Sequence, residues 1–375
     1  MYIKRIVYEN FRNLVNGEIY PVPEINVIYG ENAQGKTNLL ECIWLFTGGH
    51  SFRGSKDTEL TTISKKPGEN TPYTQLKAEF FKEERNQNAV LKIQKGRRSS
   101  IINGVEKKTG SALVGKICAV IFSPEHLQLI KEGPLNRRNF IDSAICQINP
   151  LYVKTLSVYN RLLSQRNALL KDILKHPDLC DTLDVWNMRL AKYAAQIMLK
   201  RTWYMKILQP KCQRIYAGIA KGREEMTISY QPNVEFEQDK INEDELEKKI
   251  MEELRKSEKF DIKTGHTSAG PHRDDLYIEV GNLSARLYAS QGQQRSAVLS
   301  LKLSEAEILE EKTFETPIIL LDDVMSELDT NRQDYLLNHL DNKQVFITCC
   351  APETVNLMQK GRLFYVENGI ITVRE

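Results

Sequence analysis

Hydrophobic and polar residues alternate along much of the first 120 positions, which is typical of β-strands that bury one face. The alternation and short apolar runs predict strands at residues 1–8, 25–29, 73–81, 89–94 and 99–102, with a turn at Asn103-Gly104. One helix interrupts the series after residue 38, because apolar side chains recur there at helical spacing, namely Leu39, Leu40, Ile43, Trp44 and Phe46. The first part of the chain is therefore predicted to be rich in strands.

The middle of the chain has a helical period. From about residue 134 to 225 glycine is scarce, and apolar residues step by three and four. Two such runs, 152–173 and 183–208, flank a turn at 175–178, and Pro210 is expected to end the second run. This pattern predicts either a hairpin of two antiparallel helices with coiled-coil-like seams or a plain helical subdomain without an arm.

Strand patterns return after residue 262. Continuous apolar stretches at 317–321 and 344–348 predict buried parallel strands, with a helix at 331–340 between them. Residues 363–366 and 370–373 are predicted to pair across an Asn368-Gly369 turn. We therefore predict an α/β fold in which a lobe made of residues 1–122 and 262–375 is split by an inserted helical lobe at residues 123–261.

Composition and charge narrow the possible classes of protein. The chain has 375 residues, of which 41% are hydrophobic and 27% charged, as in soluble globular proteins. We find neither a membrane-spanning apolar run nor the pattern of a signal peptide. Seven cysteines without a C-x-x-C pair predict reduced thiols in a cytoplasmic protein, not a disulfide framework or a zinc site. The net charge of +3 neither requires nor excludes nucleic acid.

Residues 30–37 match the phosphate-loop pattern G-x-x-x-x-G-K-[ST]. The loop reads Gly30, Glu31, Asn32, Ala33, Gln34, Gly35, Lys36 and Thr37, and Asn38 follows it. A predicted buried strand precedes the loop and a helix with an apolar face follows it, as phosphate binding by backbone N–H groups requires. We expect Lys36 to neutralise phosphate charge and the Thr37 hydroxyl to bind Mg²⁺. A glycine turn without a ligand is the alternative.

Two further motifs bear on nucleotide chemistry. Asp322 and Asp323 follow the strand at 317–321. Asp322 is expected to bind Mg²⁺ either directly or through one of the ligands of the ion, and Asp323 to polarise the attacking water. The alternative is that these acids cap the next helix. The second motif, S-x-G-Q, opens a long helix and predicts an anion site at Ser290, Gly292 and Gln293, with a simple capped helix as the alternative.

The order of phosphate loop, helical insertion, S-x-G-Q helix and double-acid strand resembles the ATP-binding-cassette (ABC) ATPases of chromosome maintenance and DNA repair. Within that group the chain resembles the RecF family of bacterial DNA replication and repair proteins over nearly its whole length. The resemblance rests on ENFRN at 9–13, SPE at 123–125, GPLNRRNFID at 133–142, GPHRDD at 270–275 and LDDVMSELD at 321–329. The chain departs from RecF proteins at Glu132, where they usually carry a glycine. It departs from many ABC ATPases at Asp323, where they carry glutamate, and at Thr348, where they carry histidine, and these two differences suggest slow hydrolysis.

The resemblance implies a head of the ABC type that dimerises on DNA when ATP binds. In such a dimer the segment around Ser290 of one copy caps the γ-phosphate held by the phosphate loop of the other copy. It also implies binding to gapped or junction DNA, cooperation with RecO and RecR in loading RecA on single-stranded DNA, support of the SOS response, and a nucleoid-associated place in the bacterial cytoplasm. Arg12 corresponds to an arginine that reaches the nucleotide phosphates, and a surface arginine on an edge strand is the alternative.

Basic residues outside these motifs are candidates for contacts with DNA phosphates. They are Arg53, Lys56, Lys95, Arg97, Arg98, Lys107 and Lys108, although solvated turns often carry such residues. Arg137 and Arg138 could contact either DNA or carboxylates of the helical lobe. Two other functions stay open at this point. One is a different ABC-type ATPase of DNA metabolism, and the other is a P-loop phosphotransferase, in which S-x-G-Q and S-E-L-D would have no role.

Overall fold

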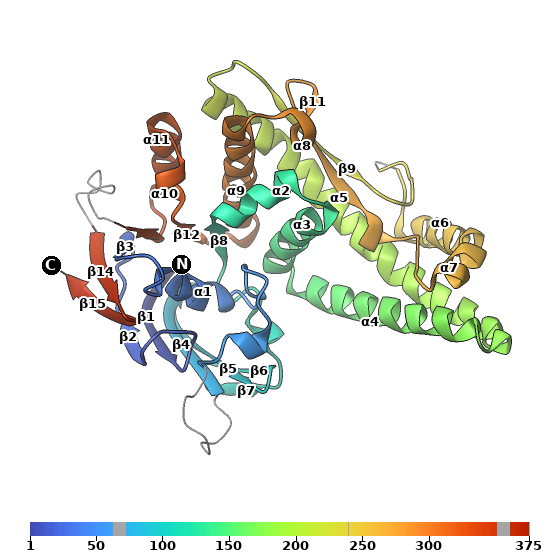
Figure 1. The fold of residues 1–375 in the computed structure, drawn as a ribbon, viewed down its shortest axis with the longest axis horizontal. Coiled ribbons are helices and arrows are strands. Elements are labelled where there is room, and N and C mark those ends of the chain that lie inside the picture. Colours follow the sequence, from blue (N-terminus) through green and yellow to red (C-terminus); the bar gives the residue numbers. More distant parts are fainter. Residues whose placement is uncertain (63–72, 239, 351–360, 375) are drawn as a thin grey trace. The chain divides into compact units, whose positions relative to one another are not determined.

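The structure is a computed structural model that describes residues 1–62, 73–238, 240–350 and 361–374 (Figure 1). The chain forms two compact units. Unit 1 comprises Met1–Leu127, Gly218–Gly222 and Gln294–Glu375, and unit 2 comprises Gln128–Ala217 and Arg223–Gln293. Parallel strands and helices in unit 1 confirm the predicted α/β class.

The first sheet of unit 1 has the strand order β15-β14-β3-β13-β12-β8 within the described residues. Its strands are β3 (Ile25–Tyr29), β8 (Ala119–Phe122), β12 (Ile318–Asp322), β13 (Val345–Cys349), β14 (Gly361–Glu367) and β15 (Ile370–Arg374). All neighbours are parallel except β15, which runs antiparallel to β14. Strands β8, β12 and β13 are buried at every position, which explains their unbroken apolar sequences.

The second sheet of unit 1 is antiparallel, with the order β2-β1-β4-β5-β6-β7 in the part of the chain that the structure describes. Its strands are β1 (Tyr2–Glu9), β2 (Gly17–Ile19), β4 (Tyr73–Lys82), β5 (Arg85–Gln94), β6 (Arg97–Ile102) and β7 (Val105–Lys107). Burial alternates along β4, as the sequence pattern predicts for a strand with one face in the core. One hydrophobic core joins side chains of both sheets with those of the helix that follows β3.

The helices of unit 1 connect these strands (Figure 1). They are α1 (Lys36–Leu45), α9 (Gln291–Thr313, whose first three residues belong to unit 2), α10 (Val324–Glu327) and α11 (Thr330–Asn338). Short 3₁₀ helices occur at η1 (Asp57–Glu59), η2 (Gly110–Leu113) and η3 (Pro124–Leu127). Helix α1 packs on β12 and β13, so the start of this helix lies at the same sheet edge as the ends of those strands.

Unit 2 is mostly helical and includes a three-stranded sheet of order β11-β10-β9. Its helices are α2 (Gln128–Lys131), α3 (Pro134–Ile148), α4 (Pro150–Ile173), α5 (Leu183–Ala220, whose last three residues belong to unit 1), α6 (Glu243–Lys256), α7 (Glu258–Thr264) and α8 (Ala285–Tyr288). The remaining elements are η4 (Pro177–Thr182), η5 (Pro271–Arg273), β9 (Met226–Gln231), β10 (Asp275–Val280) and β11 (Leu283–Ser284).

Helices α4 and α5 form a hairpin, one of the two arrangements predicted for this region. The connection between them contains η4, and the Nε atom of Arg166 on α4 donates a hydrogen bond of 2.7 Å to Asn187 on α5. The prediction that Pro210 ends the second helix is wrong, because Pro210 lies inside α5. A proline removes only one backbone donor, and the packed helix continues for ten residues beyond it to Ala220.

The boundary of the helical insertion differs from the predicted one. Residues 262–293 were expected in the α/β lobe, but they belong to unit 2. The reason is that β10 pairs along its whole length with β9. The charged helix α6 lies between these two strands in the sequence. Residues 123–127 were expected in the helical lobe and belong to unit 1. Strand pairing between segments far apart in sequence therefore decides the boundary.

Buried ion pairs hold unit 2 together. The Arg201 guanidinium contacts the carboxylates of Asp142 at 2.8 Å and Asp274 at 2.9 Å. Arg137 binds the carboxylate of Asp275 through two hydrogen bonds of 2.7 and 2.9 Å. A carboxylate of the helical lobe was one of the two partners predicted for Arg137, and DNA was the other. Burial raises the pKa of Asp274, while its bonds to Arg201 and other donors oppose that rise. The motif at 270–275 thus forms a structural turn anchored by buried charge.

Candidate nucleotide-binding site

The phosphate-loop sequence connects β3 to α1, the context that its pattern requires. Two of its glycines are needed for steric reasons. Gly30 has φ 149°, and a Cβ atom added there would lie 2.3 Å from the carbonyl oxygen of Val366. Gly35 has φ 117°, and a Cβ atom would lie 2.8 Å from the Leu14 side chain. The backbone can therefore make this tight curve only with glycine at both positions.

Lys36 lies within the curve of the loop, with only 8% of the residue exposed. Its ammonium donates hydrogen bonds to the carbonyl oxygens of Gly30 at 2.5 Å and Glu31 at 2.8 Å. The backbone of the loop thus holds the positive charge at the first turn of α1. A phosphate at this helix N-terminus would meet both the ammonium and the unpaired backbone N–H groups of the helix.

Thr37 and Asp322 meet although they are 285 positions apart in the sequence. The Thr37 hydroxyl donates to Oδ1 of Asp322 at 2.8 Å, and the Thr348 hydroxyl donates to the same oxygen at 2.9 Å. The sheet order explains the contact, because β13 lies between β3 and β12 and all three end at one edge. Burial raises the pKa of Asp322, and the two hydroxyl donors partly offset that rise.

This arrangement fits Mg²⁺, which prefers hard oxygen ligands such as hydroxyl and carboxylate. Thr37 and Asp322 supply one of each, and a cation would favour the charged form of the buried carboxylate. Elsewhere in the described residues no group of three His, Cys, Asp or Glu side chains could hold a metal ion. A Mg²⁺ ion at Thr37 and Asp322 would therefore take its other ligands from phosphate and water.

Asp323 has a left-handed backbone, with φ 53°. It stands directly before α10, but its side chain makes no capping hydrogen bond, so the alternative that it caps this helix is wrong. Instead, its backbone N–H donates to the Thr348 hydroxyl at 2.9 Å, and its Oδ1 accepts from Ser326 at 3.2 Å. An aspartate held in a rare conformation at a site of this kind is suited to orient a reactant, such as water.

Thr348 is a site residue for which the sequence predicted no contact. It donates to Asp322 and accepts from the backbone of Asp323, so a single hydroxyl ties the two acids to β13. The sequence marked this position only as one where related ATPases carry histidine. The register of β12 against β13, which pairs Asp322 with Thr348, could have indicated its role.

Arg12 lies in the turn after β1, not on an edge strand as the alternative had it. Its guanidinium forms two hydrogen bonds, of 2.8 and 2.9 Å, with the fully buried carboxylate of Glu41 on α1, and a third of 2.9 Å with Ser55. The side chain is therefore tied to the phosphate-loop helix through Glu41. Its assignment as a phosphate contact stays a prediction.

The basic candidates for DNA contacts separate into three groups. Arg98 is an internal side chain, 8% exposed, that pairs with Asp57 at 2.6 Å and with the Gly49 carbonyl, and this structural role accounts for it. Arg53 donates to Asn38 on α1 at 3.1 Å, which places its charge beside the phosphate loop. Burial raises the pKa of Asp322, and the charge of Arg53 opposes that rise. The others are exposed: Lys56, Lys95, Arg97, Lys107 and Lys108.

The S-x-G-Q segment belongs to unit 2 and begins α9. Ser290 is exposed, and its hydroxyl accepts from the backbone N–H of Gln293 at 3.3 Å. In return the Gln293 side chain accepts from the backbone N–H of Ser290 at 2.7 Å and donates to Glu224 at 2.6 Å. The segment therefore forms a reciprocal helix cap, which was the alternative expectation, and it also presents Ser290 to solvent. Gly292 lies in the first turn of this helix.

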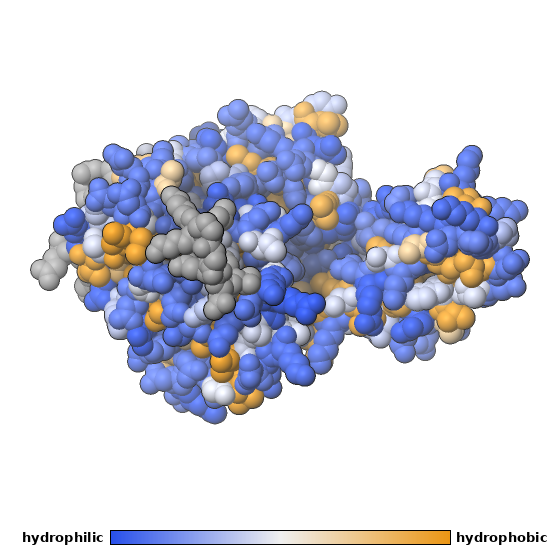
Figure 2. Space-filling view, turned by 60° about the horizontal axis from the view of Figure 1, so that its bottom comes forward, coloured by the Kyte–Doolittle hydropathy of each residue, from blue (hydrophilic) through white to orange (hydrophobic). Residues whose placement is uncertain are grey.

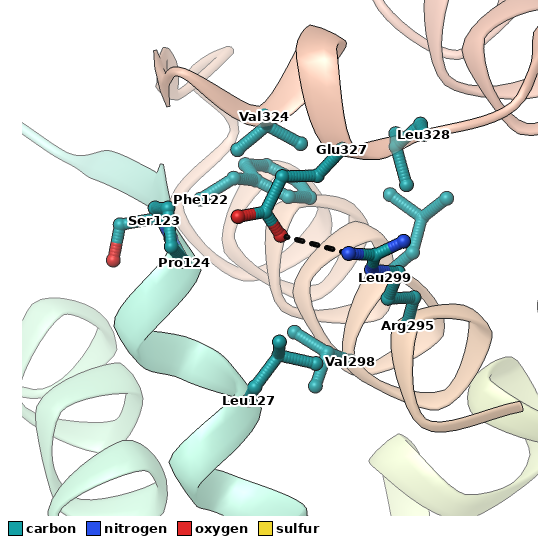
Figure 3. Close-up of a pocket in the computed structure, with 10 residues that line it drawn as sticks. All are labelled: Phe122, Ser123, Pro124, Leu127, Arg295, Val298, Leu299, Val324, Glu327 and Leu328. Carbon is teal, nitrogen blue, oxygen red and sulfur yellow. Dashed lines mark ion pairs between the residues drawn. The ribbon is translucent and has the colours of Figure 1, made fainter. Parts of the chain in front are cut away.

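A small cavity in unit 1 lies between η3, α9 and α10 (Figure 3). Glu327 points across it toward Arg295, and their charged atoms are 3.7 Å apart. The cavity measures about 40 Å³. Pockets for small molecules typically hold about 300–1,000 Å³, so a nucleotide does not fit here. The phosphate loop and the acids beside it remain the candidate site.

Comparisons with known proteins show the family to which this chain belongs. Residues 2–372 match the RecF/RecN/SMC N terminal domain. The DNA replication and repair protein RecF of Acetivibrio thermocellus is 40% identical to this chain over 367 residues, covering 98% of both proteins. RecF of Agathobacter rectalis is 41% identical over 376 residues, covering 100% of this chain and 99% of that protein. The chain belongs to the RecF family. The family resemblance read from its motifs is thereby confirmed.

Solved structures agree with this assignment. The RecF-family chain superimposes with a TM-score of 0.91 and 37% identity on a structure described as the recombination mediator protein RecF with ATP in the RecFOR pathway, covering 100% of this chain and 98% of that one. A Smc head bound to a domain of ScpA gives a TM-score of 0.57 at 16% identity, covering 100% and 97%, which supports the ABC-type fold alone. In the described residues no helix has both the length and the apolar character of a membrane span.

Proposed function

We propose that this RecF-family chain is an ATP-dependent DNA-binding protein of recombinational repair and replication restart. The observation that carries the proposal is the hydrogen bond between Thr37 and Asp322, next to the buried Lys36. It brings together a phosphate loop, a hydroxyl and a carboxylate, which are the groups needed to hold ATP with Mg²⁺. ATP is the nucleotide that a 37%-identical relative is described with.

Each site is completed by a second copy of the chain. Ser290, Gly292 and Gln293 of one protomer cap the phosphates held by residues Gly30 to Asn38 of its partner. Support comes from the exposure of Ser290 at the start of the 23-residue helix α9, since a helix N-terminus attracts anions. Arg12 and Arg53 add positive charge near the loop, Arg12 through its link to α1 and Arg53 through Asn38. ATP thus joins two protomers into a homodimer.

ATP hydrolysis sets the lifetime of the dimer. Asp323 orients the attacking water, and Asp322 and Thr37 are the residues that would hold Mg²⁺, which would neutralise phosphate charge. Aspartate is shorter than glutamate, and Thr348, whose hydroxyl is bound to the two acids, takes the place of a histidine. Both features favour weak ATPase activity, stimulated by DNA, that releases the dimer after it has served its purpose.

DNA is the substrate on which the dimer assembles, with gaps and single-strand/double-strand junctions preferred. The exposed cations Lys56, Lys95, Arg97, Lys107 and Lys108 are the remaining candidates for phosphate contacts. RecO and RecR are the protein partners, and together they load RecA on single-stranded DNA and support the SOS response. The protein then acts in the bacterial cytoplasm at the nucleoid. The RecFOR pathway named for the relative supports these partners.

The site is tested by Lys36→Ala, which removes the ammonium from the loop. Calorimetric titration with Mg²⁺ and ATP is expected to show at least a hundredfold loss of affinity, which corresponds to roughly 2.8 kcal/mol. Lys175→Ala removes an exposed lysine of unit 2 and serves as the matched control with unchanged affinity. Light scattering on gapped DNA should then show that Lys36→Ala no longer dimerises with ATP. Unchanged ATP affinity in Lys36→Ala would exclude the proposed site.

A further inference from the structure

Two large apolar side chains stand in solvent just before Ser290. Leu287 is 72% exposed and Tyr288 is 66% exposed, both on the short helix α8. Only Ala285 of this helix is buried, and a cavity of about 260 Å³, lined in part by Arg286 and Leu287, lies beside it. Packing within the part of the chain that the structure describes therefore does not explain the size or the apolar character of these two side chains.

A second exposed apolar pair stands beside the phosphate loop. Val15 is 51% exposed and Ile370 is 52% exposed. The backbone N–H of Val15 donates to the carbonyl of Gly369 at 2.9 Å, and the N–H of Gly369 donates to the carbonyl of Gln34 at 3.1 Å. The Val15–Ile370 pair is thus carried by backbone that is hydrogen-bonded directly to the loop.

Exposed apolar residues are scattered on most protein surfaces and need no explanation singly. The face drawn in Figure 2 is of this kind, with small apolar patches among predominantly hydrophilic residues. The two pairs differ in their position. The Leu287–Tyr288 pair lies just before Ser290, and the Val15–Ile370 pair adjoins Gln34. Each pair therefore flanks one half of the composite site, which is the proposed site formed by Ser290 of one copy and the phosphate loop of the other.

We propose that Leu287 and Tyr288 of one protomer pack against Val15 and Ile370 of a second copy when ATP joins the two. This inference rests on the proposed function, in which Ser290 meets the partner's phosphate loop. Tyr288 is two residues from Ser290, and two residues span at most about 7 Å. Once Ser290 reaches the partner's loop, α8 therefore lies near the surface that borders that loop, which includes the backbone bonded to Gln34.

Charge and symmetry support the second copy as the occupant. Arg286 on α8 and Glu31 on the phosphate loop are both exposed and carry opposite charges, so the rims of the two surfaces are complementary. In a dimer with twofold symmetry the contact occurs twice, and each contact buries two apolar side chains from each copy. Two patches this small suit an association that needs ATP as well, because permanent dimers bury far larger apolar interfaces.

The test compares three double variants by light scattering with a non-hydrolysable ATP analogue and Mg²⁺. Leu287→Ser with Tyr288→Ser removes the first pair, and Val15→Ser with Ile370→Ser removes the second. Leu151→Ser with Leu174→Ser is the matched control, since these leucines are 68% and 59% exposed at the two ends of α4. All the substituted side chains are largely exposed, so thermal unfolding should confirm that each variant folds.

Either test variant is expected to raise the dissociation constant of the ATP-bound dimer about a hundredfold or more. ATP binding to the monomer, measured by calorimetry at low protein concentration, should stay within about twofold of the parent, and the control should dimerise like the parent. An unchanged dimer in either test variant overturns the inference. If both apolar double variants dimerise like the parent while Ser290→Arg abolishes the dimer, only the apolar contact is refuted. If the parent itself stays monomeric with the analogue, the composite site fails as well.

Discussion

Thr348→Val tests how the acids at the end of β12 are held. The substitution keeps the shape of the side chain and removes its hydroxyl. In the structure this hydroxyl donates to Asp322 at 2.9 Å and accepts from the backbone N–H of Asp323 at 2.9 Å. Because Thr348 is 1% exposed, water cannot easily replace either bond.

The stability lost in Thr348→Val can be estimated from these two hydrogen bonds. A hydrogen bond to a charged group contributes about 1.5–3 kcal/mol, and a buried donor left without a partner costs about 1–3 kcal/mol. The two effects share one atom and are not additive, so we expect a local destabilisation of about 2–4 kcal/mol. Hydrogen–deuterium exchange in β12 and β13 measures this local stability directly. Thr348→Ser keeps the hydroxyl and should cost less than about 1 kcal/mol for the lost methyl group.

Thr348→Val should also change the pH dependence of ATP binding in the presence of Mg²⁺. Burial raises the pKa of Asp322, and the Thr348 hydroxyl opposes that rise. Mg²⁺ binds the ionised carboxylate, so Mg²⁺-dependent ATP binding should weaken as pH falls through this raised pKa. Removing the hydroxyl raises the pKa further and moves the decline to higher pH. ATP titrations with Mg²⁺ across the acidic to neutral range would show the shift. An unchanged pH profile with unchanged exchange in β12 would refute the reasoning.

Three further outcomes are expected. Asp323→Asn removes the group proposed to orient water, so it should bind ATP, hydrolyse it at least tenfold more slowly and accumulate as a dimer on sedimentation; normal turnover would identify another base. Ser290→Arg should bind ATP with parental affinity yet sediment as a monomer, and a dimer would argue against its role in trans. Arg98→Ala breaks the ion pair with Asp57 and should destabilise unit 1 by about 1.5–3 kcal/mol, whereas Arg97→Ala should leave stability unchanged and lower the salt slope of DNA binding by about one.

The parallel sheet and the phosphate loop could be predicted from the sequence because their signals are local. A strand buried on both faces is an unbroken apolar run, as at Ile318–Asp322, and the loop has a fixed glycine spacing that its backbone demands. Family membership and the α/β class followed from these motifs, and both are confirmed.

Contacts between distant segments could not be predicted in the same way. The bonds from Thr348 to the two acids depend on the register of β13 against β12. Arg98 has the same local sequence character as Arg97, and only the position of Asp57, 41 residues earlier, makes it an internal ion pair. The pairing of β9 with β10 likewise moved residues 262–293 out of the predicted lobe. Charge pattern and periodicity carry no information about such partners.

The central place of β3 in its sheet has a consequence for synthesis on the ribosome. Both neighbours of this early strand, β13 and β14, are made more than 300 residues after it. The nascent chain therefore carries an apolar strand with two bare edges through most of translation, a state that invites aggregation. The loop that follows this strand gains its surroundings only when translation nears residue 367. Chaperones that shield unpaired strands should accordingly matter more for producing this protein than its final stability suggests.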